Sequence, residues 1–248
     1  MDMYIIKLGG SVITNKSDYK TFNKKIAGDL IKEIVKSKQQ VILVHGAGSY
    51  GHIIAKQAGI GKNAVYDYNA VSQVSLDVLQ LNYEILNTSK KAKLNAISIP
   101  PRAIVIMEKG NILSFDIEII KTLVEKQITP VLFGDVALDT HWNFSIISGD
   151  DIILHLAKNL KPEKVIFVSD IDGVFSKNKK LIPDLNEVNP KEIVAWKKDS
   201  DATGGILKKI EVMQNLSEIG IHGSLINGKV KNRLLNALSN KDVISTNF

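Results

Sequence analysis

Short runs of apolar residues alternate along the chain with longer amphipathic stretches. Six runs, bounded mostly by Gly, Pro or Asp, predict buried strands over residues 4–8, 41–45, 96–99, 130–133, 164–169 and 223–226. Apolar residues recur at helical spacing over 23–37, 71–93, 116–126, 150–160 and 203–219. Gly110 and Asn111 separate two further short runs, 104–107 and 112–114, which predict a small hairpin. The alternation predicts an α/β fold, a mostly parallel open sheet sandwiched by helices.

Composition narrows the classes of function. The 248 residues include no cysteine, which excludes disulfides, thiolate metal sites and cysteine nucleophiles. The start of the chain lacks the pattern of a signal peptide, and no stretch approaches the ~20 apolar residues of a membrane span. We therefore expect a cytoplasmic protein without a membrane partner. The formal net charge of +6 suits either nucleic acid or a small anionic ligand. Because the basic residues do not alternate with aromatic ones, we expect no nucleic-acid partner.

The loop after the first predicted strand has the residues of an anion site. In open α/β sheets, ligands bind at the carboxyl ends of the strands. Here the sequence runs Lys7-Leu-Gly-Gly-Ser11, with Lys16 following. Paired glycines let backbone N–H groups approach an anion, and Ser11 adds a hydroxyl donor. The alternative is a glycine turn with two solvated lysines, but Lys7 lies in an apolar strand, where an unpaired ammonium would be costly.

The second strand is followed by a glycine pattern with two interpretations. Gly46, Gly48 and Gly51 match the Gly-x-Gly-x-x-Gly dinucleotide fingerprint. That fingerprint normally follows the first strand, however, and no acidic residue closes a convincing strand about twenty residues later. We favour a helix N-terminus offered to a phosphate. His52 would then point into the same site, with a packed core histidine as the alternative.

Three later loops carry further candidate residues. Ser148-Gly-Asp-Asp151 opens a helix with more acid than capping requires, so we expect one carboxylate to organise the clustered lysines. Ser169-Asp-Ile-Asp-Gly-Val174 superficially resembles the nucleophile loop of haloacid-dehalogenase phosphatases, but it lies too late in the chain for that class. Thr203-Gly-Gly-Ile-Leu-Lys-Lys209 places two lysines, Lys208 and Lys209, near a helix start. Basic residues are less favoured there, so we expect the two lysines to serve a ligand.

Taken in order, these five segments resemble the amino acid kinase superfamily over residues 3–228, nearly the whole chain. Within it the chain is most similar to the archaeal isopentenyl phosphate kinases. Further matching segments are Lys7 to Thr14, Val44-His-Gly-Ala-Gly-Ser-Tyr-Gly-His52, Gly134-Asp-Val136 and Asp201-Ala-Thr-Gly-Gly205. One departure is Ala47, where many relatives have a third glycine. A backbone contact at that position should survive the change.

The resemblance implies a role for each matching residue. Lys16 would stabilise the transferring phosphoryl group, and His52 would bind the acceptor phosphate. Asp150 would organise the lysines. The remaining expected contacts are with ATP, from Lys7, Gly9, Gly10, Ser11, Gly48, Asp170, Gly205 and Lys208, and with the acceptor, from the backbone of Ala47 and Gly149.

The resemblance also implies the reaction, phosphorylation of isopentenyl phosphate by ATP with Mg²⁺ bridging the nucleotide and no metal ligand from the protein. The alternatives within the superfamily are kinases of fosfomycin or of a carboxylate. A non-catalytic nucleotide sensor is a further alternative, but it would be expected to have lost the lysines. Relatives are usually homodimers. We expect one domain over 1–248, with residues 1–145 on the acceptor side and 146–248 on the nucleotide side. The helix over 71–93 carries an apolar stripe, Val74, Val78 and Leu81, which belongs either to the core or to a pocket for a short apolar tail.

Overall fold

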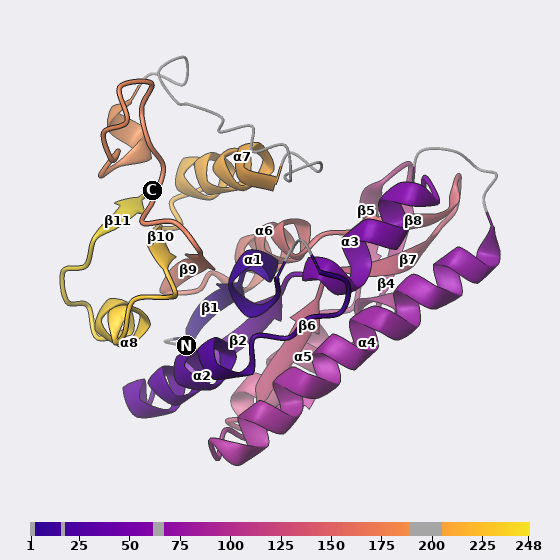
Figure 1. Ribbon diagram of the computed structural model, residues 1–248, viewed down its shortest axis with the longest axis horizontal. Coiled ribbons are helices and arrows are strands. Elements are labelled where there is room, and N and C mark those ends of the chain that lie inside the picture. The colour runs from indigo at the N-terminus through magenta and orange to yellow at the C-terminus, as the bar shows by residue number, and fades with distance from the viewer. Residues whose placement is uncertain (1–2, 16–17, 62–66, 189–204) are drawn as a thin grey trace.

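A seven-stranded sheet forms the centre of the computed structural model, which describes residues 3–15, 18–61, 67–188 and 205–248 (Figure 1). All neighbouring strands are parallel except the last pair, β10 and β11. The order across the sheet is β11 (Ser245–Asn247), β10 (Gly223–Asn227), β9 (Lys164–Ser169), β1 (Met3–Leu8), β2 (Gln40–His45), β6 (Thr129–Phe133) and β3 (Ala96–Ser98).

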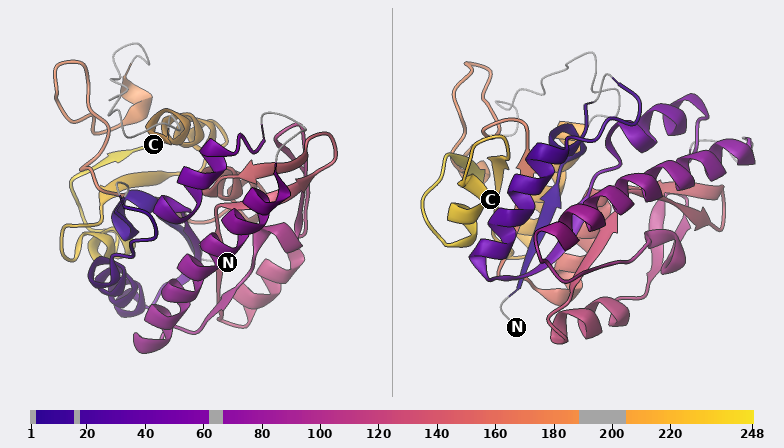
Figure 2. Two further views of the ribbon diagram at one scale, coloured as in Figure 1. Left: turned by 45° about the vertical axis from the view of Figure 1, so that its right-hand side comes forward. Right: turned by 60° about the horizontal axis from the view of Figure 1, so that its bottom comes forward.

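Helices cover both faces of this sheet, as the two further views show (Figure 2). One face packs against α2 (Lys24–Ser37), α4 (Tyr68–Lys91) and α8 (Arg233–Leu238), and the other against α5 (Glu118–Glu125), α6 (Gly149–Leu160) and α7 (Gly205–Glu218). Strand β1 shows the reason, because side chains alternate between the two faces of a strand. Tyr4 and Ile6 belong to the core beneath α2, whereas Met3 and Ile5 belong to the core beneath α6.

A second, four-stranded sheet extends the molecule beside α4. Its order is β5 (Asn111–Phe115), β4 (Val105–Glu108), β7 (Asp135–Asp139) and β8 (Asn143–Ile147). The helix α3 (Gly48–Gln57) lies against α4, and a separate apolar cluster joins α4 to this sheet through residues such as Val74, Val78 and Val136. The chain therefore has one sheet whose strand ends carry the glycine loops and a second sheet that helps to flank them.

The predicted α/β architecture is confirmed. All six predicted strands of the large sheet and the hairpin of β4 and β5 are present, with ends that differ by at most one residue. The helix predicted over 203–219 is α7; residues 203 and 204 lie outside the described residues. Unpredicted elements are β7, β8, β11, the short helices α1 (Gly10–Ile13) and α8, and the 3-10 turns Pro101–Ala103 and Leu185–Glu187. Within the described residues, no helix is both long and apolar enough to cross a membrane.

Candidate active site

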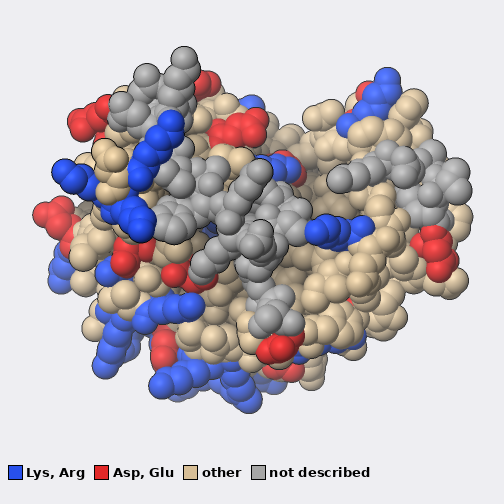
Figure 3. All heavy atoms as spheres, turned by 45° about the horizontal axis from the view of Figure 1, so that its top comes forward, with Lys and Arg blue, Asp and Glu red and all other residues tan. Residues whose placement is uncertain are grey.

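A cavity of about 1430 Å³ lies where β1, β2 and β9 end and where α1, α3 and α6 begin. The first amides of a helix have no partner within it and carry a partial positive charge, so three helix N-termini favour an anion here. Figure 3 shows a notch in the surface, with lysine and arginine atoms beside it. The predicted site residues that line the cavity are Lys7, Gly9, Gly10, Ser11, Ala47, Gly48, His52, Gly149, Asp150, Asp170 and Lys208.

The two glycine loops pack directly against each other. A Cβ on Gly10 would lie 2.6 Å from the Cα of Gly48, and one on Gly46 would lie 2.8 Å from the backbone nitrogen of Gly10. Gly48 also has φ +52 and leaves no room beside Thr14, whose Oγ1 accepts a hydrogen bond from the Ser49 amide at 3.1 Å. We call Gly9, Gly10, Gly46 and Gly48 the glycine junction. Only residues without side chains fit this contact, which brings backbone from both loops to the cavity.

Lys7 and Asp150 form a buried ion pair beside the glycine junction. Their exposed fractions are 6% and 7%, and the Lys7 ammonium donates to the Asp150 carboxylate. Burial raises the pKa of the Asp150 carboxyl, but the charges of Lys7, Lys209 and Lys208 outweigh this effect and hold its pKa below the usual range. The pair therefore places an ammonium at the end of β1 without leaving it uncompensated.

The neighbouring aspartate holds a different lysine. Asp151 Oδ2 accepts from Ser148 in the capping box of α6 and from Lys208 Nζ at 2.8 Å. The structure pairs Lys7 with Asp150 and Lys208 with Asp151, and Lys16, the other lysine that one carboxylate was expected to hold, lies outside the described residues. The two aspartates thus divide the cations between the end of β1 and the start of α7.

Lys209, the second of the two lysines expected to serve a ligand near the start of α7, is also a cavity residue. It lines the cavity beside Lys208, and its charge lowers the pKa of Asp150 more than that of Lys208 does. The signal available in the sequence was only the adjacent pair of lysines one turn into α7. A linear motif could not tell which of the two has the larger effect on the pKa of Asp150.

The remaining predicted residues that the structure describes come from separate elements. His52 is exposed on α3 and lines the cavity, so it is not a packed core histidine, which was the alternative. Asp170 lies just after β9 and lines the cavity. Gly205 is the first residue of α7. Lys16 lies outside the described residues.

Apolar side chains form another side of the same cavity. We call Ile53, Val74, Val78 and Ile146 the apolar wall, which is contributed by α3, α4 and β8. Val74 and Val78 are both buried and cavity-lining, so these members of the predicted stripe belong to core and pocket at once. Leu81 belongs to the core beneath the large sheet.

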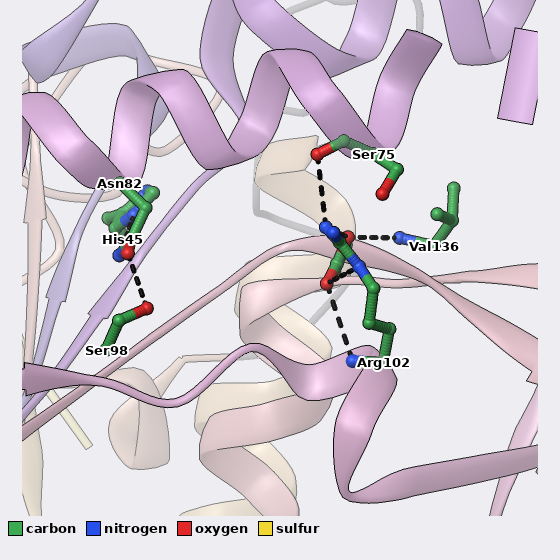
Figure 4. Close-up of polar contacts among 7 residues, drawn as sticks. His45, Ser75, Asn82, Ser98, Arg102 and Val136 are labelled. Atoms are coloured by element: carbon green, nitrogen blue, oxygen red, sulfur yellow. Dashed lines mark hydrogen bonds and ion pairs between the residues drawn. The ribbon is translucent and has the colours of Figure 1, made fainter. Parts of the chain in front are cut away.

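Two buried polar clusters fix the elements around this wall (Figure 4). His45 is fully buried at the end of β2, where its Nδ1 donates to the Gly46 carbonyl and its Nε2 accepts from Asn82 Nδ2 at 3.1 Å. Burial lowers the pKa of His45 to about 4, which keeps the ring neutral. Arg102 Nε donates to Asp135 Oδ2 at 2.9 Å, and its guanidinium also donates to the Ser75 carbonyl of α4. Strands β2 and β7 are thereby joined to the helix that carries Val74 and Val78.

Comparison with known proteins places this geometry in one family. Residues 2–227 match the model of the amino acid kinase family. The chain is 32% identical to the isopentenyl phosphate kinase of Methanothermobacter thermautotrophicus, with 98% of each chain covered. It is 33% identical to that of Thermoplasma acidophilum over 94% of each. A crystallographic isopentenyl phosphate kinase superposes with a TM-score of 0.87 at 29% identity, covering 99% of this chain and 100% of the other.

Proposed function

The chain belongs to the amino acid kinase family, and from this premise we propose that it is an ATP-dependent isopentenyl phosphate kinase. The observation that carries the proposal is one cavity that joins a cationic, glycine-lined end to an apolar wall. The first suits phosphates and the second a short hydrocarbon tail. The names of full-length relatives support the same substrate, and they disfavour fosfomycin or a carboxylate as the acceptor.

The proposed chemistry relies on position and charge. An acceptor phosphate is already ionised and needs no strong general base, so the protein must align two phosphates and offset their repulsion. We assign the ATP phosphates to the glycine junction, Ser11 and Lys7. His52 and the amides of Ala47 and Gly149 would bind the acceptor phosphate, and Lys16 would neutralise the transferring group. Asp170, Gly205 and Lys208 would lie on the nucleotide side.

Mg²⁺ would enter this site together with the nucleotide. Bound to ATP, it would offset phosphate charge, and we assign it no protein ligand. Asp150 Oδ1 is buried without a hydrogen-bond partner among the described residues, so acceptor capacity remains for a bound group or a repositioned lysine. We also propose that residues 1–145 provide the acceptor side, that residues 146–248 provide the nucleotide side, and that the protein is cytoplasmic.

The direct test is ADP release from Mg-ATP with isopentenyl phosphate as acceptor. We expect turnover with this acceptor and at least ten-fold lower kcat/KM with fosfomycin or a free carboxylate. Formation of isopentenyl diphosphate should be verified by mass spectrometry. Turnover of fosfomycin or the carboxylate alone would contradict the proposal.

Lys208 and Lys209 offer a matched test of the nucleotide side. Lys209 acts more strongly on Asp150, whereas Lys208 is half-exposed and paired with Asp151. We expect Lys209→Met to lower kcat about 10²-fold, the scale of losing one preorganised charged group. Lys208→Met should lower it by about ten-fold or less. Steady-state kinetics of both variants measure the two losses of kcat. A larger loss for Lys208→Met than for Lys209→Met would assign the more important charge to Lys208.

We further propose a homodimer that uses the outer face of α4 and the edge strand β3. This surface exposes large apolar side chains, with exposed fractions of 58% for Tyr68, 52% for Leu76 and 63% for Tyr83. On β3, Ile97 is 44% exposed at the edge of the large sheet. Light scattering should give the mass of a dimer, and Tyr83→Glu should give a monomer. A wild-type monomer would contradict the proposal.

A further inference from the structure

The segment between α1 and α2 forms part of the cavity and is closed at its base. Thr14 and Phe22 form a β-bridge, and the Asn23 amide donates to the Ile13 carbonyl at 2.7 Å. Thr14, Asn15 and Asn23 line the cavity. We call the described residues of this segment, 14–15 and 18–23, the α1–α2 loop. Its base is held by its own backbone and by hydrogen bonds of Asn15 with Asp18 and Thr21, whereas its tip reaches a neighbouring helix.

The tip of this loop is bound to a buried carboxylate on α4. Asp77 is fully buried, and its side chain accepts from the Tyr19 hydroxyl and pairs with Lys20 Nζ at 2.6 Å. Gln73 Nε2, one turn earlier in α4, donates to the same carboxylate at 2.6 Å. Near the base, the Thr21 amide donates to Ser49 Oγ of α3 at 3.3 Å.

A buried carboxylate at this position is costly for the helix alone. Asp77 lies between Val74 and Val78 in the sequence of α4, and both are buried. Removing a charge from water is unfavourable unless it is paired and hydrogen-bonded. Two of its partners come from the loop, and the contact also raises the pKa of Tyr19 to about 12, through burial and the bond to Asp77. The Asp77 carboxylate therefore bonds mainly to the loop, which supplies two of its three side-chain partners among the described residues, and only Gln73 comes from its own helix.

We propose that Asp77 is a positioning residue, which holds the α1–α2 loop against α4 through Tyr19 and Lys20 and so fixes one side of the cavity. The same helix carries Val74 and Val78 of the apolar wall, so α4 sets the position of the wall and of the loop together. The kinetic consequence rests on the proposed function, in which Lys16 neutralises the transferring phosphoryl group.

The test combines proteolysis with kinetics on the full chain. Tyr19→Phe removes only the hydroxyl that Asp77 binds, at a side chain exposed enough to avoid a folding defect. We expect trypsin to cut the Lys20–Thr21 bond about ten-fold faster in this variant, and kcat to fall about ten-fold. KM for ATP should change less than two-fold, because the glycine junction is untouched.

Controls separate positioning from general stability. Lys121→Met breaks an exposed ion pair with Glu118 in α5, on the other face of the large sheet, and should leave cleavage and kcat at wild-type values. Tyr19→Phe combined with Asp77→Asn should be no worse than Asp77→Asn alone, since both changes break one contact. A lower melting temperature with unchanged cleavage and kcat for Tyr19→Phe would overturn the proposal. Proteolysis needs no substrate, so failure of the wild type to use isopentenyl phosphate would contradict the function and leave this test intact.

Discussion

The glycine junction and the apolar wall line the same cavity, but backbone atoms form the junction and side chains form the wall. The junction is backbone against backbone, where a Cβ at Gly10 or Gly46 would come within 2.8 Å of the other loop. The wall is made of side chains from three elements, and polar clusters around His45, Asp77 and Arg102 support it. The junction therefore tolerates almost no change, whereas the wall can vary in size while its supports remain.

This difference suits the two tasks that we propose. Phosphates are the same in every kinase of this kind, and a rigid set of amides and ammonium groups binds them with little reorganisation. Acceptor tails differ, and apolar side chains can be exchanged within a packed wall at modest cost.

The largest effect should follow Asp150→Asn. An asparagine cannot balance the buried Lys7 ammonium, and breaking a buried ion pair from one side costs about 3–5 kcal/mol of unfolding free energy. We expect kcat to fall about 10²- to 10³-fold as Lys7 loses its position. Asp151→Asn is the matched change, and the half-exposed pair with Lys208 should cost only about 1 kcal/mol. Chemical unfolding and initial rates test both, and equal losses would refute the division of labour between the two aspartates.

Gly10→Ala should have the next largest effect. The new methyl group would meet backbone atoms of Gly48, which cannot move aside as a side chain can, so the two loops must separate. A displacement near 1 Å can lower the rate about 10²-fold. Gly28→Ala in α2 provides the control, since the nearest atom to the new methyl group would be Thr88 Cγ2 at 3.8 Å. An alanine within a helix should raise the free energy of unfolding by about 1 kcal/mol relative to glycine. A Gly10→Ala enzyme with wild-type kcat would show that the junction is not tightly packed.

The sequence predicted the junction better than the wall for a physical reason. Glycines and lysines beside strand ends have few other uses, so Gly9, Gly10, Gly48 and Lys7 could be identified from local sequence. Strands β7 and β8 contain Asp, Asn and Ser, which are rare in strands, and they depend on distant contacts. Asp139, for example, accepts from the amides of Lys109 and Gly110. The partners of Asp77 and the choice between Lys208 and Lys209 also arise only after folding.

His45 joins the two regions, and its protonation should weaken both. Its pKa is near 4 in the folded protein and near 6.5 in the unfolded chain, so the unfolded chain binds more protons between these values. The contribution of neutral His45 to the free energy of unfolding is therefore fully present above about pH 6.5. It is lost as the pH drops towards 4, which lowers the free energy of unfolding by about 2–3 kcal/mol. His45→Gln, which has no titrating ring, should flatten this slope. Urea unfolding across this pH range measures the slopes, and identical slopes for His45→Gln and wild type would contradict the assignment.

The smallest expected effect tests the apolar wall itself. Val74→Ala removes two methyl groups from the cavity and should admit a longer acceptor tail, since each buried CH₂ is worth about 0.8 kcal/mol. We expect the ratio of kcat/KM for geranyl phosphate to that for isopentenyl phosphate to rise about ten-fold, with KM for ATP unchanged. Val71→Ala is the matched control, because Val71 is buried in the same cluster of α4 but does not line the cavity. If both variants shift the ratio equally, the change reflects loosening of α4, and Val74 does not bound the tail. If only Val74→Ala shifts it, the wall can be resized while the glycine junction continues to hold the phosphates.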